Sequence, residues 1–270
     1  MMKKLIFPLL FALGISTHVD AQKPYKAYMV SNTHLDTQWL WTVQTTIDHY
    51  LYRTLTQNFW LIDHYPGYIF NFEGAVRYQW AKEYYPTEYE RLKNYIKAGR
   101  WNISGSSWDS TDSNIPSPES FFRNLLYGQE FFKKEFGKKS NDIFLPDCFG
   151  FGYTLPTIAA HSGIIGFSTQ KLQHRKLPFY GDRKLPFMFG LWEGIDGSRI
   201  MAVPHAQDYV SRFDGQELSS NGKLVDLAKN GLNNTVYHYY GAGDRGGSPT
   251  IASVRSVETG MKGEGPVQII

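Results

Sequence analysis

The feature that most constrains the fold of this chain is a repeated alternation of short apolar segments with longer segments of helical periodicity. The apolar segments have the length of buried strands and occur at residues 27–30, 68–72, 101–104, 143–147, 164–169 and 235–240. A hairpin-like pair is expected at 187–192 and 200–203. Helical periodicity occurs at 40–62, 75–84, 88–98, 117–136, 154–161 and 218–229. Repeated β-α units without a low-complexity linker predict one α/β domain built on a parallel sheet or a barrel, and periodicity alone does not separate the two.

The first 21 residues have the pattern of a secretory signal peptide. Two lysines precede an apolar core at 5–15, and Val19-Asp20-Ala21 offers a cleavage site before Gln22. The apolar core is shorter than the about 20 residues that a membrane-spanning helix needs. The single cysteine, Cys148, is too distant to accept a lipid at the cleavage site and has no disulfide partner. We therefore expect a bacterial protein that is secreted across the inner membrane and is soluble in the periplasm.

Charge and composition exclude some classes of partner. The formal net charge is +3, and no basic run is longer than Lys138-Lys139, so no surface for nucleic acid or for an anionic membrane is indicated. Aromatic residues make up 16% of the chain, and they can fill a core or offer flat faces on which sugar rings stack. Composition does not separate these two uses.

His34 and Asp36 are the first candidates for a metal site. They follow the segment 27–30, where a strand opens into a loop. Residues two apart in an extended backbone point to the same side, so the imidazole and the carboxylate should converge on one point. One neutral nitrogen and one anionic oxygen suit a divalent metal such as zinc, and Trp39 and Trp41 place flat apolar surface beside it. In the alternative interpretation, His34 caps the strand end and Asp36 caps the following helix without any metal.

Further candidates follow the other expected strands, because reactive groups in α/β folds collect at the carboxyl ends of strands. They are Asp112, Asp147, Gln170, His205, Asp208 and Asp244. Asp147 lies on a glycine-flanked turn between an apolar strand and a helix, which can present its carboxylate to a cleft. The alternative is an aspartate that hydrogen-bonds its own turn. Asp244 lies on a glycine-rich loop that lacks the Lys-Ser/Thr ending of a P-loop, so a close-packed turn carrying one acid is the better interpretation.

Six blocks of the sequence, in the same order, resemble the alpha-mannosidases of glycoside hydrolase family 38. They are HLDTQWLW at 34–41, NIPS at 114–117, FLPDCFG at 144–150, TQKL at 169–172, WEGIDGS at 192–198 and GDRGG at 243–247. The resemblance implies a seven-stranded β/α barrel, a bound Zn²⁺ ion and hydrolysis of alpha-mannosidic bonds in glycans with retention of configuration.

The same resemblance implies roles for individual residues. His34, Asp36 and Asp147 would be zinc ligands, and Asp147 would also be the nucleophile. Asp244 matches the loop that carries the general acid. The residues expected to contact the sugar are Trp39, Asp112, Gln170 and Asp208.

One zinc ligand of the family has no counterpart here. The family supplies a fourth ligand, a histidine, from well beyond the position that corresponds to Ile270. The histidines interpreted instead as solvated or core residues are His49, His64, His161, His174 and His238. We therefore expect residues 22–270 to be the amino-terminal part of a catalytic domain, with an incomplete barrel, labile zinc and little or no turnover alone.

Two other functions stay open on the sequence alone. A truncated barrel could keep its aromatic surface and lose the zinc site, which would leave an inactive glycan-binding remnant. Another zinc-dependent carbohydrate hydrolase, such as a polysaccharide deacetylase, would also place His and Asp near strand ends. The ordered blocks around Asp147 and Asp244 favour the mannosidase.

Overall fold

The computed structural model describes residues 23–172, 175–177, 181–183 and 185–270. The predicted signal peptide at 1–21 lies outside these residues, and so does His174. Among the described residues, no helix has the length and apolar character needed to cross a membrane.

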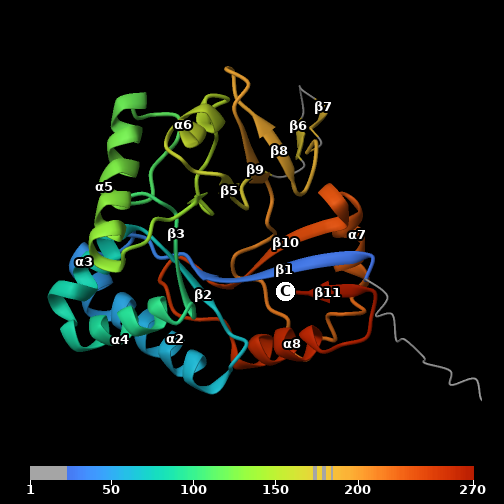
Figure 1. Cartoon of the computed structure of the whole chain (residues 1–270), viewed down its shortest axis with the longest axis horizontal. Coiled ribbons are helices and arrows are strands. Elements are labelled where there is room, and N and C mark those ends of the chain that lie inside the picture. Colours follow the sequence, from blue (N-terminus) through green and yellow to red (C-terminus); the bar gives the residue numbers. More distant parts are fainter. Residues whose placement is uncertain (1–22, 173–174, 178–180, 184) are drawn as a thin grey trace, which may run out of the picture.

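Five parallel strands form the first sheet. They are β1 (Tyr25–Thr33), β2 (Phe70–Glu73), β3 (Trp101–Ser104), β10 (Thr235–Ala242) and β11 (Val267–Ile269). The order is β10-β1-β2-β3, and β11 also pairs with β1. Strand β1 crosses the middle of the molecule (Figure 1) and pairs with β10 along most of its length, whereas it meets β2 only at its end, where Asn32 lies opposite Asn71. The residues that follow β1 therefore emerge at the carboxyl edge of this sheet.

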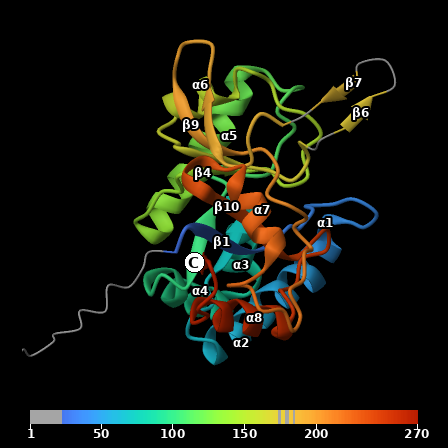
Figure 2. The ribbon, with the colours of Figure 1, turned by 90° about the vertical axis from the view of Figure 1, so that its right-hand side faces the viewer.

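The second sheet has four strands. In order they are β4 (Asp142–Phe144), β5 (Gly166–Ser168), β9 (Arg199–Val203) and β8 (Gly190–Glu193). Strands β4, β5 and β9 are parallel, and β8 is antiparallel to β9, which confirms the expected hairpin-like pair. A further antiparallel pair, β6 (Arg175–Leu177) and β7 (Gly181–Arg183), stands away from the main body of the fold (Figure 2).

Within the part of the chain that the structure describes, hydrogen bonds join the two sheets, and two of these junctions are formed at Asp142 and Ala206. At the first, the Ser104 hydroxyl donates to Oδ2 of Asp142 at 2.6 Å, and the Gly105 amide donates to Oδ1 at 3.1 Å. At the second, the amide of Tyr239 donates to the carbonyl of Ala206, just after β9, at 2.8 Å. The predicted α/β fold with parallel strands is confirmed. Backbone pairing divides these strands between two sheets, so the seven-stranded barrel implied by the resemblance is not confirmed.

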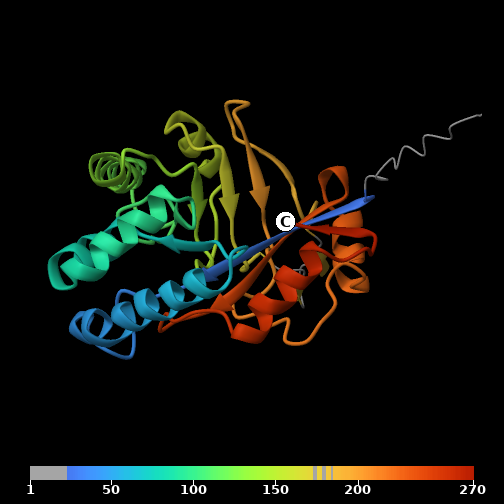
Figure 3. The same ribbon diagram turned by 60° about the horizontal axis from the view of Figure 1, so that its bottom comes forward.

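Helices cover the outside of the sheets. They are α1 (Val43–Thr45), the π-helical turn η1 (Thr46–Leu51), α2 (Tyr52–His64), α3 (Ala75–Tyr84), α4 (Pro86–Lys97), α5 (Pro118–Phe136), α6 (Leu155–His161), α7 (Gly222–Lys229), the 3₁₀ turn η2 (Leu232–Asn234) and α8 (Ile251–Met261). Helices α2, α4 and α8 lie along one side of β1, while α5 and α6 lie toward the second sheet (Figures 1 and 3). Helix α8 packs beside the end of α2, where Arg255 donates to the Tyr65 hydroxyl at 3.1 Å.

Capping side chains explain where several helices begin. The hydroxyl of Ser117 accepts the Ser120 amide at 3.2 Å, so α5 starts at Pro118 as the sequence predicts. The helix expected at 40–62 instead begins at Val43, because the Thr42 hydroxyl caps it. It then passes through the π-helical turn η1 before it continues as α2.

The structure also corrects the expected start of one helix and the expected order of the last elements. The helix expected at 218–229 begins only at Gly222, because the Asn221 side chain accepts the Leu224 amide at 3.2 Å and caps the first turn. The strand expected at 235–240 is β10, but it is not the last strand, since α8 and β11 follow it. In α8, serines occupy some of the buried positions, so the apolar periodicity of this helix is weak.

Aromatic side chains fill much of the core beneath the first sheet. Trp101 is 1% exposed, and its ring lies 4.6 Å from that of Phe70. Its indole N–H donates to the buried hydroxyl of Tyr78 at 3.0 Å, which satisfies the polar end of the side chain. Part of the high aromatic content is therefore explained by packing.

Candidate metal and active site

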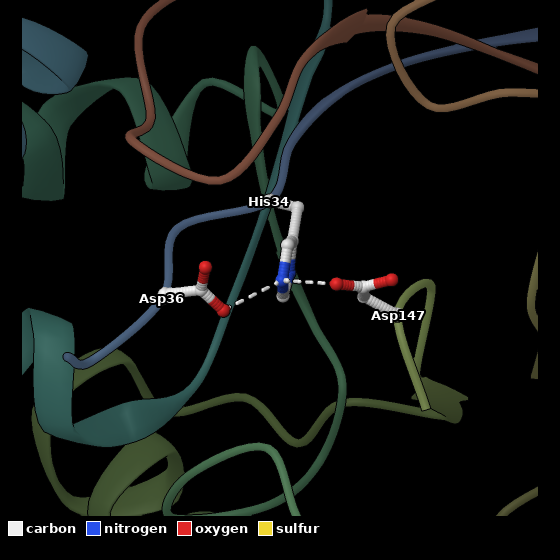
Figure 4. A group of neighbouring side chains, drawn as sticks. All are labelled: His34, Asp36 and Asp147. Carbon is white, nitrogen blue, oxygen red and sulfur yellow. Dashed lines mark hydrogen bonds and ion pairs between the residues drawn. The ribbon is translucent and has the colours of Figure 1, made fainter. Parts of the chain in front are cut away.

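The carboxyl ends of β1 and β4 bring three side chains together (Figure 4). Nε2 of His34 lies 3.1 Å from Oδ1 of Asp36 and 3.8 Å from Oδ2 of Asp147. Backbone hydrogen bonds hold the loop in place: the His34 amide donates to the Ala242 carbonyl at 3.0 Å, and the Asp36 amide donates to the Asp244 carbonyl at 2.8 Å. The structure thus places His34, Asp36 and Asp147 around one point, as the sequence predicts.

These three side chains could hold a metal ion. One ligand atom from each lies within 4.8 Å of the other two. One imidazole nitrogen and two carboxylate oxygens form a donor set that zinc accepts, and three protein ligands leave a coordination position open. The ammonium of Lys171 pairs with Oδ1 of Asp147, which leaves Oδ2 facing His34. The residues present therefore fit a divalent metal.

The other ring nitrogen of His34 lies against a buried carboxylate. Nδ1 is 2.9 Å from Oε1 of Glu73, the last residue of β2, and Glu73 is 1% exposed. Burial lowers the pKa of His34, but hydrogen bonds to Asp36 and Glu73 outweigh this effect and raise the pKa to about 9. In the metal-free protein the imidazole therefore carries a proton at neutral pH, which a metal at Nε2 must displace.

A buried arginine fixes the loop that follows β1. Arg77 of α3 is 1% exposed, and its Nε donates to the carbonyl of Leu35 at 3.0 Å. Its Nη1 pairs with Oδ1 of Asp109 at 2.9 Å, and the Thr37 hydroxyl donates to Oδ2 of the same carboxylate at 2.6 Å. This network ties the loop to α3 and to the segment after β3.

Asp244 lies across the same site, after β10. The φ angle of Asp244 is 55°, and the backbone of the neighbouring Arg245 forms an isolated antiparallel β-bridge with that of Leu35. Oδ1 of Asp244 accepts a hydrogen bond from the Tyr209 hydroxyl at 2.7 Å, and the Tyr209 ring lies 5.4 Å from the imidazole of His34. A hollow of about 460 Å³ is lined by Asp36, Gln38, Trp39, Asp147, Phe149, Lys171, Tyr209 and Asp244.

The aromatic and acidic residues expected at the sugar have different surroundings. Trp39 is 62% exposed at the rim of this hollow, so its face is accessible. Asp112 lines a smaller hollow beside His34, where its Oδ1 accepts the amides of Asn114 at 2.7 Å and Ile115 at 3.1 Å. Asp112 therefore hydrogen-bonds its own turn as well as lining this hollow.

Gln170 and Asp208 lie farther along, in a neighbouring cavity of about 970 Å³. Oε1 of the buried Gln170 accepts the Tyr209 amide at 2.8 Å. Asp208 accepts the Val210 amide at 3.0 Å. This cavity shares Lys171, Tyr209 and Asp244 with the hollow described above, so the two spaces adjoin.

Three residues that lie at the site were not among those predicted from the sequence. Glu73 is the first polar residue after the apolar segment 68–72, the same signal that selected Asp147. Lys171 lies in the block TQKL, and Tyr209 follows Asp208 directly. Of the histidines set aside, the described ones agree with that interpretation, since His49, His64 and His161 are exposed and His238 is buried.

Fold and site together define an α/β protein with a candidate metal site at the carboxyl edge of a parallel sheet. Residues 24–269 match the family described as "Glycosyl hydrolases family 38 N-terminal domain", and the chain belongs to this family.

Named relatives agree with this membership. The chain is 39% identical over 239 residues to "Alpha-mannosidase G" of Dictyostelium discoideum and 33% identical over 233 residues to human "Alpha-mannosidase 2C1". These matches cover 87% and 85% of this chain but 21% of each relative. The chain therefore spans about a fifth of the length of these curated relatives.

Solved structures share the fold. An alpha-mannosidase from Enterococcus faecalis V583 superimposes with a TM-score of 0.68 and 20% identity, covering 88% of this chain and 26% of that chain. A putative polysaccharide deacetylase from Mycobacterium smegmatis gives a TM-score of 0.54 and 11% identity, covering 92% and 88%. At these identities the likeness concerns the fold alone.

Proposed function

We propose that this chain is the zinc-binding amino-terminal part of a retaining alpha-mannosidase that cleaves alpha-mannosidic bonds in glycans. The observation that carries the proposal is the convergence of His34, Asp36 and Asp147 at the end of two strands, with Asp244 on the same hollow. Membership of family 38 and relatives named alpha-mannosidases support it.

In this proposal, His34, Asp36 and Asp147 hold the zinc ion. A zinc ion held there would supply Lewis acidity toward sugar hydroxyls. The ionised carboxylate of Asp147 attacks the anomeric carbon, and the carboxyl group of Asp244 protonates the leaving oxygen. After the leaving group departs, Asp244 takes a proton from water, which then hydrolyses the glycosyl intermediate.

The surrounding residues bind the sugar. Trp39 offers an exposed aromatic face for stacking at the rim of the hollow of about 460 Å³. The residues proposed as hydroxyl partners are Asp112, Gln170 and Asp208. The larger cavity adjoins this hollow at Asp244 and would take the leaving-group part of a glycan, because the acid must contact the oxygen that joins the two halves of the substrate.

The finer architecture is part of the proposal. Strands β1, β2, β3, β4, β5, β9 and β10 would be the seven strands of a distorted barrel, whose wall is completed by the two junctions at Asp142 and Ala206. Residues 22–270 would form the amino-terminal part of one catalytic domain.

The proposed location is the periplasm. The lysines and apolar core within residues 1–21 support cleavage after Ala21. Amino-terminal sequencing of the exported protein tests this, and an intact Met1 in the membrane fraction would contradict it.

Hydrolysis of aryl alpha-mannosides by the protein as its organism produces it tests the chemistry. Asp147→Ala should abolish turnover even with a good leaving group, because leaving-group quality cannot replace the attacking carboxylate. Asp244→Ala should slow poor leaving groups far more than good ones. Retention is checked by following the anomeric proton of the product by NMR. Zinc and mannoside binding without hydrolysis by the unaltered protein would favour the glycan-binding alternative.

A further inference from the structure

We propose that Glu73 is a positioning residue that fixes the orientation and tautomer of His34, so that Nε2 faces the metal site. The inference rests on the proposed metal site but concerns a residue outside the six blocks that carry the family resemblance.

The pairing of strands brings the two residues together. Thr33 of β1 lies opposite Phe72 of β2, so His34, the residue after β1, and Glu73, the last residue of β2, lie at the same level of the sheet. Nδ1 of His34 lies 2.9 Å from Oε1 of Glu73. An ionised carboxylate only accepts hydrogen bonds, so Nδ1 keeps its hydrogen and donates it. The nitrogen left for a metal is then Nε2, which faces Asp36 and Asp147.

The Glu73 side chain is itself held in place. The Ser110 hydroxyl donates to Oε2 at 2.7 Å, so each carboxylate oxygen has one donor. Gly105 has φ +86°, and a Cβ atom placed there would lie 3.1 Å from Cβ of Glu73. The Gly105 backbone thus packs closely against Glu73, and the two hydrogen bonds orient the Glu73 carboxylate, which in turn orients the imidazole of His34.

Burial of the Glu73 carboxylate costs free energy, which a positioning role for this side chain would explain. Its side chain is 2% exposed, and among the described residues His34 is the one basic side chain that forms an ion pair with it. A buried anion with one such partner costs free energy that a neutral side chain of similar size would not. A carboxylate behind a metal-binding histidine also raises the basicity of the ring, which strengthens the nitrogen that faces the metal.

Zinc binding to two variants tests the inference. Glu73→Gln keeps the size of the side chain but removes its charge, and Glu73→Ala removes both. Zn²⁺ affinity is measured by competition with a chelator, and the zinc-loaded protein is examined by proton NMR for the imidazole Nδ1–H signal. His34→Ala assigns that signal. Asp142→Asn is the matched control, because this half-buried carboxylate at the start of β4 also accepts hydrogen bonds from serine hydroxyls but forms no hydrogen bond with His34.

We expect Glu73→Ala to lower zinc affinity by about 10- to 100-fold and Glu73→Gln by a smaller factor, each with a shifted or lost Nδ1–H signal. Asp142→Asn should leave both readouts unchanged even where it lowers stability. If Glu73→Ala does not fold, the isosteric Glu73→Gln decides alone. Unchanged affinity and an unchanged signal in folded Glu73→Gln would overturn the inference while leaving the metal site intact. Absence of zinc binding in the unaltered protein would instead overturn both proposals.

Discussion

The hydroxyl of Tyr209 donates a hydrogen bond of 2.7 Å to the carboxylate of Asp244, and the same aromatic ring lies 5.4 Å from the imidazole of His34. One side chain thus touches both the candidate acid and a candidate metal ligand. Burial and the neighbouring Asp244 carboxylate raise the pKa of Tyr209 above its ordinary value, so the hydroxyl keeps its proton near neutral pH and remains a donor.

Tyr209→Phe should therefore impair the acid step and spare the packing, because phenylalanine keeps the ring against His34. Losing one orienting hydrogen bond of about 1.4 kcal/mol corresponds to about a tenfold fall in kcat for mannosides with poor leaving groups. Mannosides with good leaving groups should be much less affected. Tyr153→Phe, at an exposed tyrosine, is the control. Equal losses for both kinds of substrate would remove the orienting role.

Lys171 should weaken metal binding. Its ammonium pairs with Oδ1 of Asp147, so it places a positive charge beside a candidate ligand. Lys171→Met should raise Zn²⁺ affinity by about fivefold, because about 1 kcal/mol of repulsion at a partly exposed site is removed. Lys171→Arg keeps the charge and should bind zinc like the unaltered protein. A fall in the affinity of Lys171→Met would mean that the ammonium holds Asp147 in its binding orientation instead.

Arg77 should be required for stability. Replacing it by methionine leaves the Leu35 carbonyl without this donor and the Asp109 carboxylate without its cation. Since the Asp109 side chain is 30% exposed, we expect a loss in the free energy of unfolding of about 2 kcal/mol, less than for a fully buried pair. Urea unfolding measures it.

The control for Arg77→Met is Arg123→Met. Arg123 pairs with Glu119 on the surface of α5, and both side chains are more than half exposed. Its replacement should cost less than about 1 kcal/mol. Similar losses for the two variants would contradict the importance given to the Arg77 network.

His238 should make the protein less stable in mild acid. Burial in β10 lowers the pKa of His238 from 6.5 to about 4, and Lys223 and His205 also lower it. Between these values the unfolded chain binds more protons than the folded one, so the free energy of unfolding falls as the pH drops from about 6.5 to 4. The contribution of this residue is about 3 kcal/mol, present above pH 6.5 and lost at pH 4.

The measurement compares urea unfolding at pH 7 and pH 4. His238→Asn can still donate to the Tyr239 carbonyl, but it does not titrate, so its stability should depend less on pH. His64→Asn, at an exposed histidine, should behave like the unaltered protein. If His238→Asn loses as much stability as the unaltered protein, the buried imidazole is not the cause.

The elements predicted most accurately have clear apolar periodicity and clear ends in the sequence. Strand β3 and helix α3 have the expected bounds, because Trp101 and Ile103 alternate inward and Gly74 precedes the helix. Capping side chains determine where the helices expected at 40–62 and 218–229 begin. The hydroxyl of Thr42 and the amide of Asn221 leave only a weak signal in the apolar periodicity of the sequence.

The candidate site could be predicted where its residues lie at the carboxyl ends of strands, because these ends meet at one edge of the fold. His34, Asp36 and Asp147 were found by that rule, and Glu73 obeys it too but has no neighbouring motif to draw attention to it. Arg77 could not be found in this way. It lies in the first turn of a helix, where an arginine is normally solvated, and only the tertiary fold reveals that it is buried against the Leu35 carbonyl.

The register of β1 against β10 has a consequence for synthesis of the protein. Lys26 lies opposite Thr235 and Thr33 opposite Ala242, so the first described strand finds this partner only after some two hundred further residues have been translated. His34 and Asp36 also receive their backbone acceptors, Ala242 and Asp244, from that late segment. A chain whose residues 235–244 have not yet been translated or exported therefore lacks these partners of the metal pocket and presents an unpaired edge of β1, which is when chaperones would be needed most.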